Sequence, residues 1–108
     1  MSNNMIIPEQ NYETIESMIY EIRGKRVMLD FYLAKIYGYE TKYFNRQVNN
    51  NIDKFPERYR FKLTMQEVDY LVRCKNFTSR IWQYGNGGGR RYLPYAFTEQ
   101  GIYMLNII

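Results

Sequence analysis

The spacing of apolar and polar residues along the chain predicts both strands and helices. Short apolar stretches at 17–22 and 26–29 flank a polar turn that contains Gly24, which is typical of a β-hairpin. Residues 59–63 alternate apolar and basic side chains, which predicts a half-buried strand with both basic residues on its open face. The pattern therefore predicts short antiparallel strands.

Two short helices joined at a glycine are expected between these strands. Asp30 can cap the first helix, because its carboxylate accepts hydrogen bonds from free backbone N–H groups, and Gly38 can end it in a left-handed conformation. The second helix is expected from Thr41 to about Asn51. Its apolar residues recur every four positions and define the buried stripe: Phe44, Val48 and Ile52. This arrangement of two short helices around a glycine is typical of a helix-turn-helix.

Two further helices are predicted from the residues that can cap them. Thr64 and Glu67 have the spacing of a capping box, and the helix that they open is expected to end near Cys74. Thr98 is expected to cap the last helix. We therefore expect a small α+β fold, in which a helix-turn-helix-like pair accompanies short antiparallel strands.

A glycine-rich segment at 85–89 lies between two more expected strands, at 80–84 and 90–93. No acidic residue occurs in this region, and Arg90 and Arg91 stand at the base of the expected hairpin. Such a basic hairpin resembles a wing that contacts the phosphate backbone or the minor groove. The alternative is a flexible turn without a ligand. A nucleotide-binding loop is not supported, because the segment fits neither glycine pattern of the phosphate-binding motifs.

The charge of the chain is distributed unevenly. The formal net charge is +4, yet residues 1–22 carry four glutamates and no Lys or Arg. All 15 basic residues therefore lie in the remainder of the chain, against seven acidic ones. A basic surplus of this kind attracts polyanions. We expect a flexible acidic leader at 1–16, followed by one DNA-binding domain at 17–108.

The outward side of the second helix carries amide and cationic side chains. Arginine matches the O6 and N7 atoms of guanine in the major groove, and asparagine matches the N6 and N7 atoms of adenine. We expect base contacts from Arg46, Asn49 and Asn50, and backbone contacts from Lys42 and Asn45. The alternative is an ordinary solvated helix face.

The composition argues against an enzyme. Histidine, the commonest general base, is absent, and a single cysteine cannot form a zinc cluster. The carboxylates are scattered, and Glu67 and Asp69 point to different sides of the expected helix. We therefore expect no catalytic site, no metal and no cofactor.

Three stretches together carry a family resemblance: RGKRVMLDFYLAKIYG, KYFNRQVNNNIDKFPERYRFKLT and GGRRYLPYAFTEQGIYML. They resemble the phage ORF-six-N family, the open-reading-frame-six N-terminal domain, which is related to the KilA-N and Bro-N domains. The resemblance implies a small α+β DNA-binding module of phage and prophage regulators such as antirepressor-like proteins. It also implies that the chain is the N-terminal part of a longer protein.

These observations lead to one functional hypothesis and one alternative. We expect a double-stranded-DNA-binding domain of a phage or prophage transcriptional regulator, with the second helix in the major groove. The alternative is a protein-interaction or dimerisation module that acts on a repressor protein and does not bind DNA itself. The partners that these two interpretations imply are double-stranded DNA, a repressor protein and a second copy of the chain. No membrane span or signal peptide is recognisable, so we expect a cytoplasmic protein.

Overall fold

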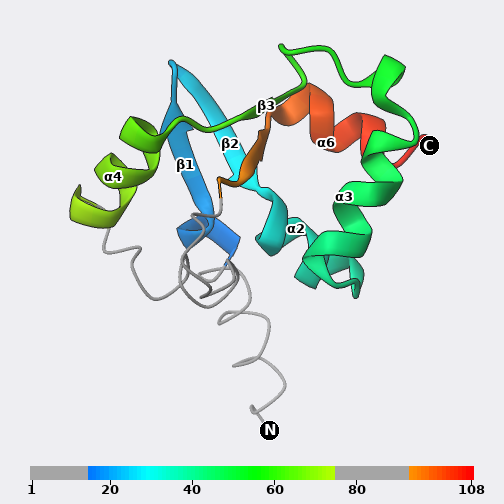
Figure 1. The fold of residues 1–108 in the computed structure, drawn as a ribbon, viewed down its shortest axis with the longest axis horizontal. Coiled ribbons are helices and arrows are strands. Elements are labelled where there is room, and N and C mark those ends of the chain that lie inside the picture. The colour runs from blue at the N-terminus through cyan, green and yellow to red at the C-terminus, as the bar shows by residue number, and fades with distance from the viewer. Residues whose placement is uncertain (1–14, 75–92) are drawn as a thin grey trace, which may run out of the picture.

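The computed structural model describes residues 15–74 and 93–108, which form a four-stranded antiparallel sheet with helices around it (Figure 1). The strand order is β1-β2-β4-β3. The elements, in chain order, are β1 (Ile19–Ile22), β2 (Lys25–Leu29), α2 (Asp30–Tyr37), α3 (Thr41–Asn49), the 3-10 helix η1 (Ile52–Lys54), β3 (Arg60–Lys62), α4 (Met65–Cys74), β4 (Tyr95–Phe97) and α6 (Glu99–Leu105). Along the longest axis of the molecule, α4 and α3 lie at opposite ends (Figure 1).

The first hairpin is confirmed. Ile22 pairs with Lys25 across the turn between β1 and β2. Both turn residues have positive φ angles, 58° for Arg23 and 74° for Gly24. Two such residues are what a two-residue turn needs to match the twist of the flanking strands.

Strand β4, which lies between β2 and β3 in the sheet, was not predicted. The sequence was expected to leave the extended conformation at Pro94, whereas β4 begins at the next residue. Ala96 and Phe97 are fully buried because β2 and β3 flank β4 on its two sides. A strand of three residues is too short to show a periodic pattern. The strands expected at 80–84 and 90–93, and the loop between them, lie outside the described residues, except for Leu93, which precedes β4 in a non-strand conformation.

The hydrophobic core lies between this sheet and the helices that cover it. The ring of Phe97 lies 5.7 Å from that of Phe44 in α3 and 6.1 Å from that of Phe55, which follows η1. Val68 and Leu71 bury the inner side of α4 in the same cluster. Aromatic pairs at these separations add to the stability that burial alone provides.

The helix pair α2 and α3 is joined at Gly38, as predicted. Gly38 has a φ angle of 82° and its N–H contacts the carbonyls of the last turn of α2. Phe44 and Val48 are buried as expected, but α3 ends at Asn49 and the expected stripe breaks there. Ile52 is 51% exposed because it belongs to η1, where the chain has left the α-helical path.

The predicted caps hold at two of three helices. In the capping box, the Thr64 N–H donates to the Glu67 carboxylate (2.8 Å) and the Glu67 N–H donates to Thr64 Oγ1 (3.1 Å). Thr98 Oγ1 accepts from the N–H of Gly101 in α6 (3.3 Å). Asp30 was expected to cap α2, but Leu29 occupies the N-cap position and Asp30 is the first helical residue. Its carboxylate is buried and accepts hydrogen bonds from the Asn45 side chain and the Tyr95 N–H.

Gly101 allows α6 to pack against the segment that leads into β3. A Cβ atom at this position would collide with the carbonyl oxygen of Tyr59. That carbonyl also accepts a backbone hydrogen bond from Thr98 (3.0 Å). The close approach therefore fixes α6 to the edge of the sheet. Within the described ranges, no helix is long and apolar enough to cross a membrane.

Candidate nucleic-acid interface

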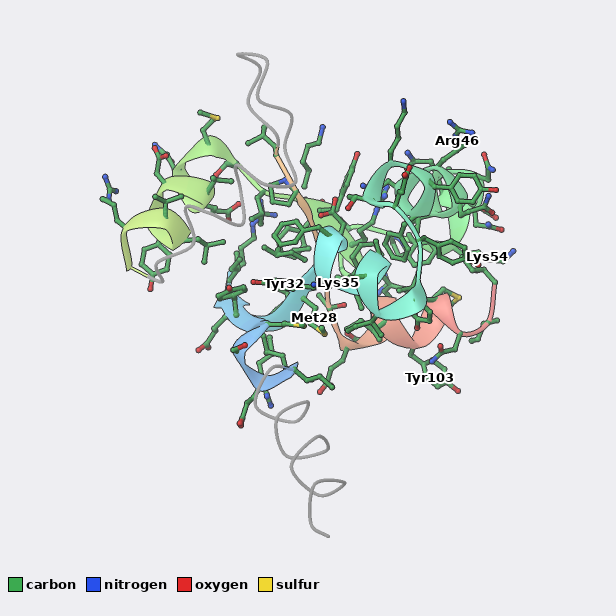
Figure 2. The ribbon with its side chains drawn as sticks, turned by 90° about the horizontal axis from the view of Figure 1, so that it is seen from below. Met28, Tyr32, Lys35, Arg46, Lys54 and Tyr103 are labelled. Atoms are coloured by element: carbon green, nitrogen blue, oxygen red, sulfur yellow. The ribbon has the colours of Figure 1, made fainter. Side chains whose placement is uncertain are left out.

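One side of α3 presents an exposed stripe formed by Lys42, Arg46 and Asn50. These residues are four positions apart, so each is offset by only about 40° from the one before it on a helix. Asn50 follows the last residue of α3 but keeps right-handed helical angles, so the stripe continues to it. Figure 2 shows the Arg46 side chain directed outward, away from the sheet. Neither Lys42 nor Arg46 forms an ion pair with any residue of the described ranges.

The neighbouring side of α3 is attached to the sheet by four polar residues, which we call the polar seam: Asp30, Asn45, Asn49 and Arg60. Nδ2 of Asn45 donates to Oδ2 of Asp30 (2.9 Å). Nη2 of Arg60 donates to Oδ1 of Asn49 (3.1 Å). Asp30 Oδ2 also accepts from the backbone N–H of Tyr95 in β4 (3.2 Å). The seam therefore joins α2, α3, β3 and β4 at one place.

Arg60 was expected on the open face of its strand, but it is only 8% exposed. Its guanidinium lies 4.0 Å from the centroid of the Tyr95 ring on the neighbouring strand. Burial lowers the pKa of Arg60 from its ordinary value, while the nearby Tyr95 and Asp30 raise it. An arginine retains its charge in spite of such a shift. The seam thus contains a buried cation and a buried acidic residue.

Two tyrosines extend the exposed surface on the other side of the stripe, and the sequence did not single them out. Tyr39 and Tyr43 are 51% and 46% exposed, and their ring centroids lie 5.9 Å apart. The guanidinium of Arg46 lies 5.8 Å from the centroid of the Tyr43 ring. For Tyr43 the signal was its position on the helix directly after Lys42, whereas Tyr39 precedes α3 in the segment after Gly38. Tyrosine hydroxyls are among the groups that contact phosphates in protein–DNA complexes.

A cleft of about 230 Å³ lies beyond these tyrosines, between α3 and the end of α6. Tyr37 and Tyr39 line it from the α2 side, and Leu105 and Ile108 line it from the C-terminal side. Tyr37 also donates a hydrogen bond to Oδ1 of Asn106 (3.0 Å). The cleft presents an apolar and aromatic surface next to the cationic one.

The predicted contact residues divide into three groups. Lys42, Arg46 and Asn50 lie together on the exposed stripe. Asn45 and Asn49 belong to the polar seam, where each already makes a hydrogen bond. The third group, Arg90 and Arg91, falls outside the described residues. No group of three or more side chains suited to a metal ion occurs in residues 15–74 and 93–108.

Comparison with models of protein families matches residues 17–108 to the model described as ORF6N domain. The match confirms the resemblance noted in the sequence and covers nearly the whole chain. The searches of curated proteins and of solved structures returned no match.

Proposed function

Since the chain belongs to the phage-associated ORF6N family, we propose that it binds double-stranded DNA through α3 and acts as part of a phage or prophage transcriptional regulator. The exposed stripe carries this proposal. Its two cations and one amide are the side-chain types that contact phosphates and base edges. They stand on a helix whose other sides are attached to the core and to the seam.

The dimensions of α3 suit the major groove. An α-helix with its side chains is about 10–12 Å in diameter, and the major groove of B-form DNA is about 12 Å wide. In this pose Arg46 donates two hydrogen bonds to guanine, Asn50 pairs with an adenine edge and Lys42 contacts phosphate. The pair α2 and α3 then corresponds to a helix-turn-helix, with α3 as its recognition helix. Arg90 and Arg91 remain candidates for backbone contacts.

The decisive experiment is a titration of a labelled mixed-sequence duplex at two salt concentrations. With about six phosphate contacts, the logarithm of the affinity should fall with the logarithm of the salt concentration at a slope of about −5. Absence of binding at low salt would contradict the proposal.

A matched pair of charge reversals tests whether α3 is the binding element. Arg46 and Arg73 are both exposed helical arginines, but Arg73 belongs to α4 at the other end of the molecule (Figure 1). We expect Arg46→Glu to lower duplex affinity about tenfold or more, because it removes a contact and introduces repulsion. Arg73→Glu changes the net charge equally and should have a much smaller effect. Equal losses in the two variants would show attraction by net charge alone.

The cleft beside Tyr39 favours one alternative, a module that binds a repressor protein or a second copy of the chain. Exposed aromatic and aliphatic side chains at the mouth of a cleft are typical of protein contacts. Sedimentation of the purified chain separates the homodimer from the monomer. A chain that binds no duplex, and whose partner contact is lost on Tyr39→Ser, would establish this alternative.

A further inference from the structure

Asn49 lies where the polar seam meets the exposed surface of α3. Its Oδ1 accepts the hydrogen bond from Nη2 of Arg60 (3.1 Å). A guanidinium offers only N–H donors and no acceptor, so the oxygen of the amide and not its nitrogen has to face Arg60. Nδ2 is therefore turned away from the guanidinium, and the Asn49 residue as a whole is exposed.

Arg60 is itself held in place. It belongs to β3, which is paired with β4, and its guanidinium lies over the ring of Tyr95 at 4.0 Å. Asp30, on the other side of the seam, favours the charged form of Arg60. A rotation of the Asn49 amide would therefore turn its N–H groups toward a fixed cation. The sheet sets the direction in which Asn49 presents its donor.

One helical turn earlier, the amide of Asn45 is oriented in the opposite sense, with its nitrogen and not its oxygen toward the seam. Nδ2 of Asn45 donates to Asp30, and its Oδ1 is buried. One asparagine of α3 thus faces an acid and the other faces a base. Rotation of either amide by half a turn would place acceptor on acceptor or donor on donor, and unpaired polar groups at a buried contact are costly. The seam fixes the rotation of α3 about its axis as well as the two amides.

We infer that Arg60 is a positioning residue that makes Asn49 a hydrogen-bond donor toward DNA and prevents it from pairing with adenine through both amide atoms. The inference rests on the proposed function. Pairing with adenine needs Oδ1 to accept from N6 while Nδ2 donates to N7. Because Oδ1 is directed at the buried Arg60, the two amide atoms do not face one base edge together, and Nδ2 donates to an acceptor such as a purine N7, guanine O6, thymine O4 or a phosphate oxygen. The side chain of Asn50 makes no hydrogen bond in the described part of the chain, so it keeps both amide atoms for adenine.

The first test uses two substitutions of the same size and charge in the full chain. Asn49→Asp retains an oxygen toward Arg60 and replaces the outward N–H groups with a carboxylate oxygen. Asn106→Asp is the matched control, because Asn106 is exposed and also accepts through Oδ1, from Tyr37 (3.0 Å), but lies at the end of α6. We expect Asn49→Asp to lower duplex affinity about tenfold or more with an unchanged or raised unfolding temperature, and Asn106→Asp to lower affinity less than about threefold.

The results distinguish the possible acceptors and the possible failures. A loss confined to preferred sequences identifies a base acceptor, and an equal loss on all duplexes identifies a phosphate. Equal effects of Asn49→Asp and Asn106→Asp would overturn the inference while leaving the proposed function intact. A wild-type chain that binds no duplex would overturn both.

The second test releases the amide. Arg60→Met removes the donor and keeps an apolar side chain over Tyr95. Selection from random duplexes should then show a preference shifted toward adenine at the base pair next to residue 49, a change that a loss of stability alone would not produce. A folded Arg60→Met variant with the wild-type preference would overturn the positioning role. Should this variant not fold, the comparison of Asn49→Asp with Asn106→Asp decides the question by itself.

Discussion

The two helices at opposite ends of the molecule, α3 and α4, are attached to the sheet region by polar contacts of different kinds (Figure 1). The polar seam beneath α3 contains Asp30, fully buried, and Arg60, 8% exposed. The contact at α4 is an ion pair at the surface, in which Nε of Arg23 lies 2.7 Å from the Glu67 carboxylate. The side chains of Arg23 and Glu67 are 35% and 23% exposed.

The difference shows what each contact contributes. A surface ion pair adds little, because water and salt screen it. Arg23 gains a further contact where its guanidinium lies 4.1 Å from the centroid of the Phe61 ring. The buried groups of the seam lose their hydration, and removal of one of them leaves its hydrogen-bonding partner unsatisfied in the interior, which is destabilising. The surface contact therefore adds little to the burial of Val68 and Leu71 that holds α4, while the seam penalises misplacement of α3, the helix that we propose binds DNA.

Removal of the buried acid is expected to have the largest effect. Asp30→Ala deprives Asn45 and the Tyr95 N–H of their acceptor and removes an acid that favours the charged form of Arg60. We expect the free energy of unfolding to fall by about 2–5 kcal/mol, because each buried donor left without its acceptor costs about 1–3 kcal/mol. Equilibrium unfolding in urea measures this. The control is Asp53→Ala at an exposed site, expected to stay within about 0.5 kcal/mol. A loss below about 1 kcal/mol for Asp30→Ala would show that the seam is not a coupled unit.

Much of the fold was predictable because its signals are local in the sequence. The turn at Gly24, the stop at Gly38 and the box at Thr64 each depend on residues within a few positions of one another. The burial of Arg60 was not predictable from its strand. It depends on Tyr95 and Asn49, which come from other elements and are adjacent only after folding.

The residues of the candidate site also differ in whether local sequence or tertiary structure determines their contacts. The helical period alone placed Lys42, Arg46 and Asn50 on one outward side, and all three are exposed. The same period assigned Asn45 and Asn49 to contact with DNA. In the folded chain one amide atom of each bonds within the seam, while Nδ2 of Asn49 is turned away from it. A helical wheel shows where side chains point but not which neighbouring element covers them. That information lies in the tertiary arrangement.

The surface contact at α4 should depend on pH. The hydrogen bond from Arg23 is the main cause that holds the pKa of Glu67 below its ordinary value; burial opposes it, and the Thr64 N–H adds to it. A carboxylate whose pKa is lowered on folding adds stability above its unfolded pKa of about 4.3, and this stability is lost as the pH falls through the folded pKa.

Glu67→Gln tests this contribution. The variant should lose about 0.5–1 kcal/mol at neutral pH, and its difference from the wild type should shrink once the pH falls below about 4.3. Urea unfolding at a series of pH values measures the difference. Glu57→Gln is the control, since Glu57 is 84% exposed and 3.9 Å from Arg23. A difference that grows on acidification would contradict the assignment.

The smallest expected effect is that of salt, which should weaken the surface contact at α4 and leave the seam unchanged. Between about 0.1 M and 1 M the Debye length falls from about 10 Å to about 3 Å, so an exposed pair loses a large part of its attraction and a buried one does not. We expect the cost of Glu67→Gln to fall by a few tenths of a kcal/mol in urea unfolding with added sodium chloride. The cost of Asp30→Ala should stay constant, because the ions do not reach the fully buried Asp30. Equal salt sensitivity would place both contacts in the same dielectric environment, and the seam would lose its distinct role in orienting α3.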